Sequence, residues 1–140
     1  MGFSTPAEAE AAFYAAFEAR TFDAMMAVWA DSDDIACIHP LAAPLNGRAA
    51  VAAGWRSLFE AAGQFRLQIE SAHTLRGDTQ VIHVVREYLV IGQETEPRPP
   101  ILATNVYRRE AGGWRMVLHH ASPLHVGGTP PARTSPVVLH

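Results

Sequence analysis

Two adjacent histidines, His119 and His120, are the first residues of this chain whose types and spacing could do chemistry. They lie in the stretch GGWRMVLHHASP, whose alternating apolar residues are typical of a strand, and neighbouring side chains of a strand point to opposite faces. Alternation puts His120 on the same apolar face as Trp114 and Leu118, and it puts His119 on the other face. The sequence therefore predicts that His120 faces the interior. An imidazole with an ordinary pKa near ~6.5 could bind a ligand or transfer a proton there.

The same inward position also suits a histidine that is hydrogen-bonded within the core. A metal site is a further use of histidines, because His39, His83 and His120 lie on three expected strands. No helix-borne HxxxH or CxxC pattern would preorganise such a site, so no metal is expected. The chain also lacks a glycine-rich phosphate loop and a dinucleotide fingerprint, so no cofactor is expected.

Three helices are expected to precede most of the strands that carry these side chains. The first has a strong start signal, with Thr5 as N-cap, Pro6 at the first helical position and Glu8 completing a capping box. The stretch 21–31 and the stretch 47–63 repeat their apolar residues at helical spacing and predict the other two.

The strands form a second group, mostly late in the chain. A short strand is expected at 35–40, before the third helix, and from residue 65 onward the apolar period changes to two. This period predicts strands at 65–75 and 79–92 and a hairpin that joins 101–109 to 114–122. The order α-α-β-α-β-β-β-β predicts an α+β domain with helices on one face of a curved sheet.

Size, charge and composition limit the classes of protein to which this chain could belong. The 140 residues suit one domain, expected at 1–124, followed by a Pro/Gly-rich tail at 125–140. A net charge of -3 with no lysine and no basic block argues against nucleic acid as a partner. The single cysteine excludes an internal disulfide, and no apolar run is long enough to span a membrane. These features, with no signal peptide visible, predict a cytoplasmic protein without membrane contact.

Several strings of this sequence resemble the nuclear transport factor 2-like superfamily, and above all its SnoaL-like and ketosteroid-isomerase-like members. The strings are YAAFEARTFDAMMAVWADSDD, IHP, LNGRAAV and GGWRMVLHHAS, and the likeness covers roughly residues 6–124. The last string is also similar to the closing strand of the association domain of calmodulin-dependent kinase. The resemblance implies a cone-shaped sheet wrapped around the N-terminal helices, a cystatin-like α+β roll. It also implies an apolar pocket at the open end of the cone and a homodimer through the outer face of the sheet.

The resemblance also implies roles for individual residues. His39, followed by Pro40, stands where ketosteroid isomerases carry the aspartate that is their general base. Tyr14 matches the tyrosine whose hydroxyl stabilises the enolate in those isomerases, where a protonated aspartate is its partner. In this chain the nearest polar candidates for that partner are Glu87 and Asn105. His120 matches the inward histidine of similar closing strands.

A further set of residues is expected to line or back the pocket, although their spacing also suits a plain core. Asn105 occupies a position where the kinase association domain carries a pocket arginine, which argues against an acidic ligand there. The set is Trp29, Trp55, Asn105, Tyr107, Phe17 and Leu118.

The strand expected at 79–92 gives independent support for a dimer, because it is apolar on both faces. One domain of this size needs only one of these faces for its core. The other face would be an exposed apolar patch unless a partner covers it.

Two functions follow from these expectations. The first is a pocket protein for a small, mostly apolar molecule, working without a cofactor as an isomerase, cyclase or dehydratase. In this function His120 and His39 transfer protons and Tyr14 donates a hydrogen bond. The alternative is a non-catalytic dimeric module for ligand binding or assembly. The sequence leaves open whether the protein is an enzyme.

Overall fold

The computed structural model describes residues 2–124 and begins with three helices. Helix α1 covers Pro6–Ala19, α2 covers Phe22–Val28 and α3 covers Arg48–Ala61. The predicted start of α1 is confirmed, because the Thr5 hydroxyl accepts a hydrogen bond from the Glu8 backbone N–H at 3.1 Å. The helix ends at Arg20, which adopts a left-handed conformation with φ of 54°.

Six strands form one curved sheet in the order β2-β1-β6-β5-β4-β3. Their bounds are β1 Ala36–Ile38, β2 Leu45–Asn46, β3 Phe65–Arg76, β4 Gln80–Ile91, β5 Ile101–Glu110 and β6 Gly113–Pro123. Among the strands described within residues 2–124, β1 and β6 pair in parallel and the other neighbours pair antiparallel, so the sheet is mixed. The α+β class and the expected element order are confirmed. Strand β2 was not expected, because two residues are too short to show a period.

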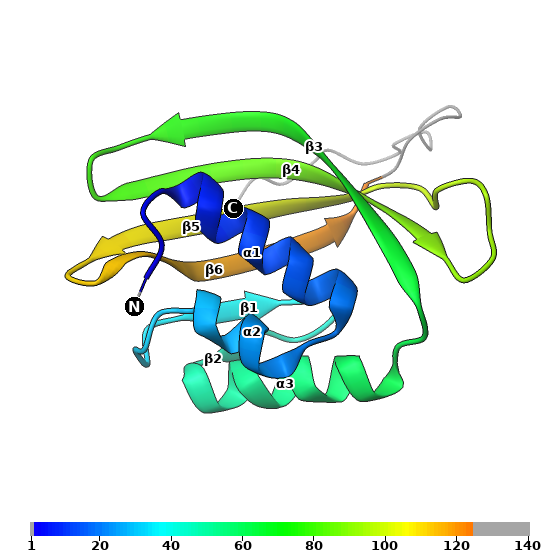
Figure 1. Ribbon diagram of the computed structural model, residues 1–140, viewed down its shortest axis with the longest axis horizontal. Coiled ribbons are helices and arrows are strands. Elements are labelled where there is room, and N and C mark those ends of the chain that lie inside the picture. Colours follow the sequence, from blue (N-terminus) through cyan, green and yellow to red (C-terminus); the bar gives the residue numbers. More distant parts are fainter. Residues whose placement is uncertain (1, 125–140) are drawn as a thin grey trace, which may run out of the picture.

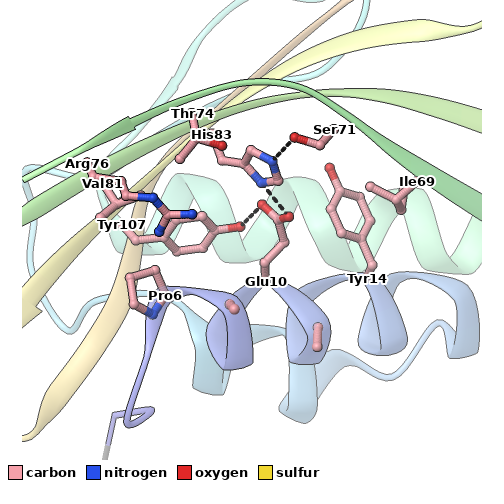
Figure 2. Close-up of a pocket in the computed structure, with 12 residues that line it drawn as sticks. Pro6, Glu10, Tyr14, Ile69, Ser71, Thr74, Arg76, Val81, His83 and Tyr107 are labelled. Atoms are coloured by element: carbon pink, nitrogen blue, oxygen red, sulfur yellow. Dashed lines mark hydrogen bonds and ion pairs between the residues drawn. The ribbon is translucent and has the colours of Figure 1, made fainter.

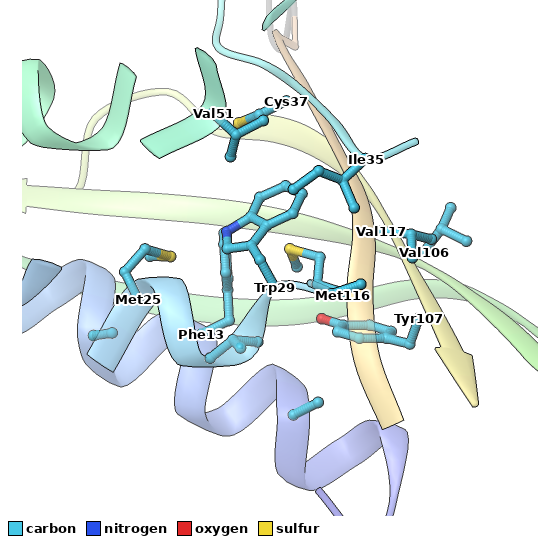
Figure 3. Close-up of a cluster of buried hydrophobic side chains, with 14 of the residues drawn as sticks. Phe13, Met25, Trp29, Ile35, Cys37, Val51, Val106, Tyr107, Met116 and Val117 are labelled. Atoms are coloured by element: carbon cyan, nitrogen blue, oxygen red, sulfur yellow. The ribbon is translucent and has the colours of Figure 1, made fainter. Parts of the chain in front are cut away.

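Helix α1 lies across one face of the sheet, and α2 and α3 lie at the end formed by β1 and β2 (Figure 1). The face of the sheet that packs against α1 is called the inner face here, and the opposite one is the outer face. Figure 3 shows the core between these layers, where Phe13 of α1 meets Met25 of α2 and Met116 of β6 around Trp29. All four side chains are fully buried. Burial of such large apolar side chains is the main source of stability for this arrangement.

A single arginine fixes α3 against the end of α2. The Arg48 guanidinium donates hydrogen bonds to the carbonyl oxygens of Met26, Trp29 and Ala30 at 3.0, 3.2 and 2.9 Å. The last carbonyls of a helix have no partner within the helix, and a cation near them is favourable. Arg48 therefore closes α2 and positions the segment that leads into β1.

The predicted orientation of the two β6 histidines is wrong. Tyr107 pairs with Met116, but the preceding Val106 pairs with Leu118, so Val117 is an extra residue in β6. This β-bulge shifts the alternation by one residue, because two residues of one strand oppose one of the other. Beyond the bulge the inward positions are odd-numbered. His119 is only 1% exposed, whereas His120 is exposed on the outer face.

The predicted tail at 125–140 lies outside the described residues. Among the helices that the structure describes, none is both long and apolar enough to cross a membrane.

Candidate functional site

A chain of buried hydrogen bonds runs from α1 through three strands beneath the helix. The Tyr14 hydroxyl donates to Glu87 Oε2 at 2.5 Å and accepts from Asn105 Nδ2 at 2.9 Å. Asn105 Oδ1 lies 2.6 Å from His119 Nδ1. Alternation on β4, β5 and β6 brings these side chains to the inner face, and the bulge at Val117 is what adds His119. All four residues are buried, as expected for polar groups that satisfy one another.

The order of donors and acceptors fixes the tautomer of His119. The amide nitrogen of Asn105 points to Tyr14, so its oxygen points to His119 and can only accept. The proton of a neutral His119 therefore sits on Nδ1, and Nε2 carries a free lone pair. Within residues 2–124 this Nε2 has no hydrogen-bond partner.

Both ends of this chain, Glu87 and His119, reach an apolar cavity of about 330 Å³. Glu87 and His119 reach it from β4 and β6, and His39 reaches it from the segment that follows β1. The remaining lining is mostly apolar: Phe17, Pro40, Leu58, Ala62, Gly63, Gln64, Phe65, Leu89, Ile91, Ile101 and Ala121. A few polar groups inside an apolar cavity are typical of small-molecule sites.

Burial changes the acidity of the groups in this cavity. Desolvation raises the pKa of Glu87 to about 7, although the hydrogen bond from Tyr14 lowers it, and the charge of Glu10 adds to the rise. Burial lowers the pKa of His119 to about 3, helped by the charges of His39 and His120. Burial also lowers the pKa of His39. At neutral pH both cavity histidines are therefore uncharged, and Glu87 is close to half protonated.

Cys37 is a buried neighbour of His39. Its sulfur lies 3.7 Å from His39 Nε2. Burial, and then the charge of Glu87, raises the pKa of the Cys37 thiol, so the thiol keeps its proton. A thiol that donates to Nε2 leaves the proton of neutral His39 on Nδ1, which makes that atom a hydrogen-bond donor.

The structure brings several of the predicted site residues together. Tyr14 and Asn105 form the buried chain with Glu87, which was named as a candidate partner of Tyr14. His39 and Phe17 line the cavity. The His39 ring lies 6.5 Å from the His119 ring, measured between centroids. His39 and Phe17 thus line the cavity, and Tyr14 and Asn105 belong to the buried chain that reaches it.

Other predicted residues lie elsewhere. His120 and Leu118 are on the outer face, because the bulge at Val117 reverses the alternation. Trp29 and Trp55 are fully buried core residues, and Trp55 packs edge-on against His39 with centroids 4.8 Å apart. Tyr107 donates to Glu10 at 2.7 Å and lines a second cavity beside α1.

Two residues of this candidate site, Glu87 and His119, were missed or underrated by the sequence pattern. Glu87 is a carboxylate inside an apolar strand, and alternation places it on the same face as Val85 and Leu89. An inward carboxylate in such a strand is a signal that could have identified it as an acid–base group. His119 had no comparable signal, because the alternation of apolar residues that precedes Val117 does not reveal the bulge.

Comparisons with known proteins agree with this fold. Residues 7–125 match the family model of the SnoaL-like domain. A solved structure from Thiobacillus denitrificans ATCC 25259 is described as a candidate calcium/calmodulin-dependent protein kinase type II association domain. It is 71% identical with a TM-score of 0.88, and the match covers 89% of this chain and 99% of that chain.

Two more distant proteins are also similar. A structure from Streptomyces avermitilis, described as a candidate dehydratase of the NTF2-like family, shares the fold at 24% identity. Its TM-score is 0.74 over 86% of this chain and 94% of that chain. The F-box protein SKIP8 of Arabidopsis thaliana is 28% identical over 110 residues, which are 79% of this chain and 46% of that protein. The chain thus spans about half the length of this curated relative. The family match includes nearly all the described residues and agrees with the resemblance seen in the sequence, and the chain belongs to the SnoaL-like domain family.

Proposed function

We propose that the cavity beneath α1 binds a small, mostly apolar and uncharged molecule and moves a proton within it without a cofactor. The observation that supports this proposal is the position of Glu87, a carboxyl with a pKa of about 7 on the wall of an apolar cavity. A general acid or base works best when its pKa lies near the working pH. Glu87 is therefore the proton-transfer group of the proposal, in place of His120.

The neighbours of Glu87 have separate roles. Tyr14 holds Oε2 with its hydroxyl, so Oε1 is the oxygen left to take a proton from a carbon next to a substrate carbonyl. The same oxygen returns the proton to another carbon, which gives an isomer of the substrate with no net change in atoms. His39 donates from Nδ1 to the charge that develops on the carbonyl oxygen, and His119 Nε2 accepts from a substrate hydroxyl or N–H.

An apolar β,γ-unsaturated ketone, 3-cyclohexen-1-one, tests this activity, because its conversion to the conjugated enone is followed by ultraviolet absorbance. We expect the wild-type rate to rise with pH through an apparent pKa near 7. Glu87→Gln should lower the rate by about 100-fold or more, the usual range for loss of a general base. Glu60→Gln, on the exposed face of α3, is the matched control.

The proposal would be rejected if Glu87→Gln and Glu60→Gln retained the same rate. Binding is measured separately, by titrating the saturated ketone cyclohexanone against protein fluorescence. Leu58→Trp, which fills the cavity, should abolish that binding while the control variant retains it.

A second function, assembly through the outer face, is favoured by a different observation. Leu75 is 53% exposed on this face, and five further apolar residues there are only partly buried: Ile82, Val84, Tyr88, Leu102 and Leu118. The relative of 71% identity carries the description of an association domain. We infer that a second copy of this chain covers the outer face, which leaves the cavity on the inner face accessible.

A further inference from the structure

A second cavity, of about 440 Å³, lies on the other side of Tyr14 between α1 and the hairpin of β3 and β4. Three residues from three elements form a line along its wall. Ser71 Oγ lies 2.8 Å from His83 Nε2, and His83 Nδ1 lies 2.6 Å from Glu10 Oε1. Figure 2 shows His83 between the other two, with one ring nitrogen directed to each.

A β-bulge builds this line. Ser71 pairs with Val85 and His73 pairs with Val84, so Ala72 is an extra residue of β3. Without the extra residue, Ser71 and Thr74 would point to opposite faces, because they are three positions apart. With it, both face α1, and Ser71 lies diagonal to His83 across the strand pair. Diagonal neighbours on one face are close enough for a histidine to reach a serine.

The hydrogen bonds around Glu10 decide the direction of proton movement. Its Oε2 accepts from the Tyr107 hydroxyl at 2.7 Å and from Asn105 Nδ2 at 3.4 Å. With donors on Oε2, the carboxyl acts as an acceptor toward His83 as well, so Nδ1 of His83 carries the proton. Nε2 is then the base that faces the Ser71 hydroxyl.

The three residues differ in how far their side chains are exposed to solvent. The side chains of Glu10 and His83 are only 14% and 21% exposed, whereas Ser71 is exposed at the cavity wall. The orienting pair is therefore sheltered while the hydroxyl is open to a substrate. A nucleophile, a base in hydrogen-bond contact and a third group that orients the base are the signature of an activated serine.

The rest of the cavity indicates the substrate. Ala11, Ile69 and Val81 provide an apolar wall, and Arg76 lies further along the same face of β3 as Ser71. Within the described part of the chain, Arg76 forms no ion pair. Its guanidinium therefore adds a positive charge to the wall of this cavity.

We propose that Ser71, His83 and Glu10 form a nucleophilic triad that hydrolyses small esters with an apolar acyl group. Ser71 Oγ forms a bond to the ester carbonyl carbon and passes its proton to His83 Nε2. The bond from that carbon to the alcohol oxygen then breaks, and the alcohol leaves with the proton from Nε2. Water attacks the acyl-Ser71 in the same way and releases the carboxylic acid, so ester and water give acid and alcohol.

A fluorophosphonate probe and p-nitrophenyl acetate test this proposal with the full chain. An activated serine displaces fluoride from the probe and retains the phosphonyl group, which intact mass measurement and peptide mapping locate. We expect one adduct on Ser71 and turnover of p-nitrophenyl acetate. Ser71→Ala should remove the adduct and lower turnover by about 100-fold or more. Ser57→Ala, at an exposed serine on α3, should retain both.

The variants of the orienting residues add a second readout. His83→Gln should slow adduct formation at Ser71 by about 100-fold, and Glu10→Gln should slow it by a smaller factor, because Ser71 itself remains. Ser71 is exposed, so Ser71→Ala is expected to fold, and circular dichroism checks each variant. An adduct spread over several serines, no adduct on folded wild type, or turnover unchanged in Ser71→Ala would each overturn the triad.

Discussion

At the scale of single residues, the environment of Glu87 decides what the first cavity can do. The same carboxyl on the protein surface would be ionised at neutral pH and would be a weak base. Burial raises its pKa, and the hydrogen bond from Tyr14 limits the rise, which leaves a value of about 7. The histidines beside it are held neutral by the same burial. One cavity thus contains a carboxyl that is close to half protonated at neutral pH and two uncharged imidazole rings.

Glu87 also predicts how stability changes with pH. Its folded pKa of about 7 lies above the ordinary value of 4.5, so the folded protein binds the proton more tightly than the unfolded chain. This contribution to stability is complete below pH 4.5 and is lost as the pH rises through 7. Relative to Glu87→Gln, the wild-type free energy of unfolding should fall by on the order of 3 kcal/mol between pH 4 and pH 8.

Urea unfolding of both proteins across this pH range measures the difference. His119 has a lowered pKa and acts in the opposite direction, losing stability as the pH falls below about 6.5. It is present in both proteins and cancels when they are compared. Parallel stability curves for wild type and Glu87→Gln would show that Glu87 has an ordinary pKa in the folded state.

At the scale of elements, two β-bulges set the chemistry of both cavities. The extra residue Val117 turns His119 inward to meet Asn105, and the extra residue Ala72 keeps Ser71 and Thr74 on one face. Both bulges lie in long strands of the curved part of the sheet. A bulge redirects side chains and is common next to active sites, so both proposed sites depend on these local irregularities.

The bulge in β6 predicts opposite outcomes for its two histidines. His119→Ala removes a fully buried ring and leaves Asn105 Oδ1 without its partner, which should cost roughly 2–4 kcal/mol in the free energy of unfolding. In the single chain, His120→Ala changes an exposed side chain, and the free energy of unfolding of the monomer should stay within about 0.5 kcal/mol of wild type. Chemical denaturation of the matched pair decides the matter. A larger loss in His120→Ala would mean that the strand keeps strict alternation.

At the scale of the whole molecule, the sheet separates two surfaces. The inner face is covered by the helices and contains both cavities, whereas the outer face presents partly exposed apolar residues from β3 to β6. If a second copy of this chain covered the outer face, the cavities on the inner face would stay accessible. Assembly would then not interfere with catalysis. The proposed enzyme and the proposed association module can therefore be the same protein.

A charged residue on the outer face of β4 tests the assembly. Tyr88→Arg puts a cation where a second copy would have to desolvate it, so we expect a dimeric wild type to become a monomer. Light scattering after size exclusion at micromolar concentration measures the mass. Leu41→Arg makes a similar change at a loop residue that is 93% exposed, and it should remain dimeric. A monomeric wild type, or a dimeric Tyr88→Arg, would contradict the proposed interface.

The sequence by itself determined the fold class and every helix and strand except the two-residue strand β2. The cap at Thr5, the helical spacing around Trp29 and Trp55, and the change to period two at residue 65 are local signals. Each signal depends on a few neighbouring residues and can be recognised without knowledge of the fold. The candidates Tyr14, Asn105 and His39 were also within reach of the sequence, because alternation or family resemblance placed them.

Only the tertiary structure decided that His119 faces inward and that Asn105 is its hydrogen-bond partner. A single bulge moves every later side chain of a strand to the opposite face. The strain and packing that place the bulge in β6 involve the neighbouring strand β5, and the local sequence of β6 carries no information about that neighbour. The line from Ser71 through His83 to Glu10 joins residues from three elements, up to 73 positions apart. The pKa of Glu87 likewise depends on burial by the folded chain, because desolvation exists only after distant segments have packed around it.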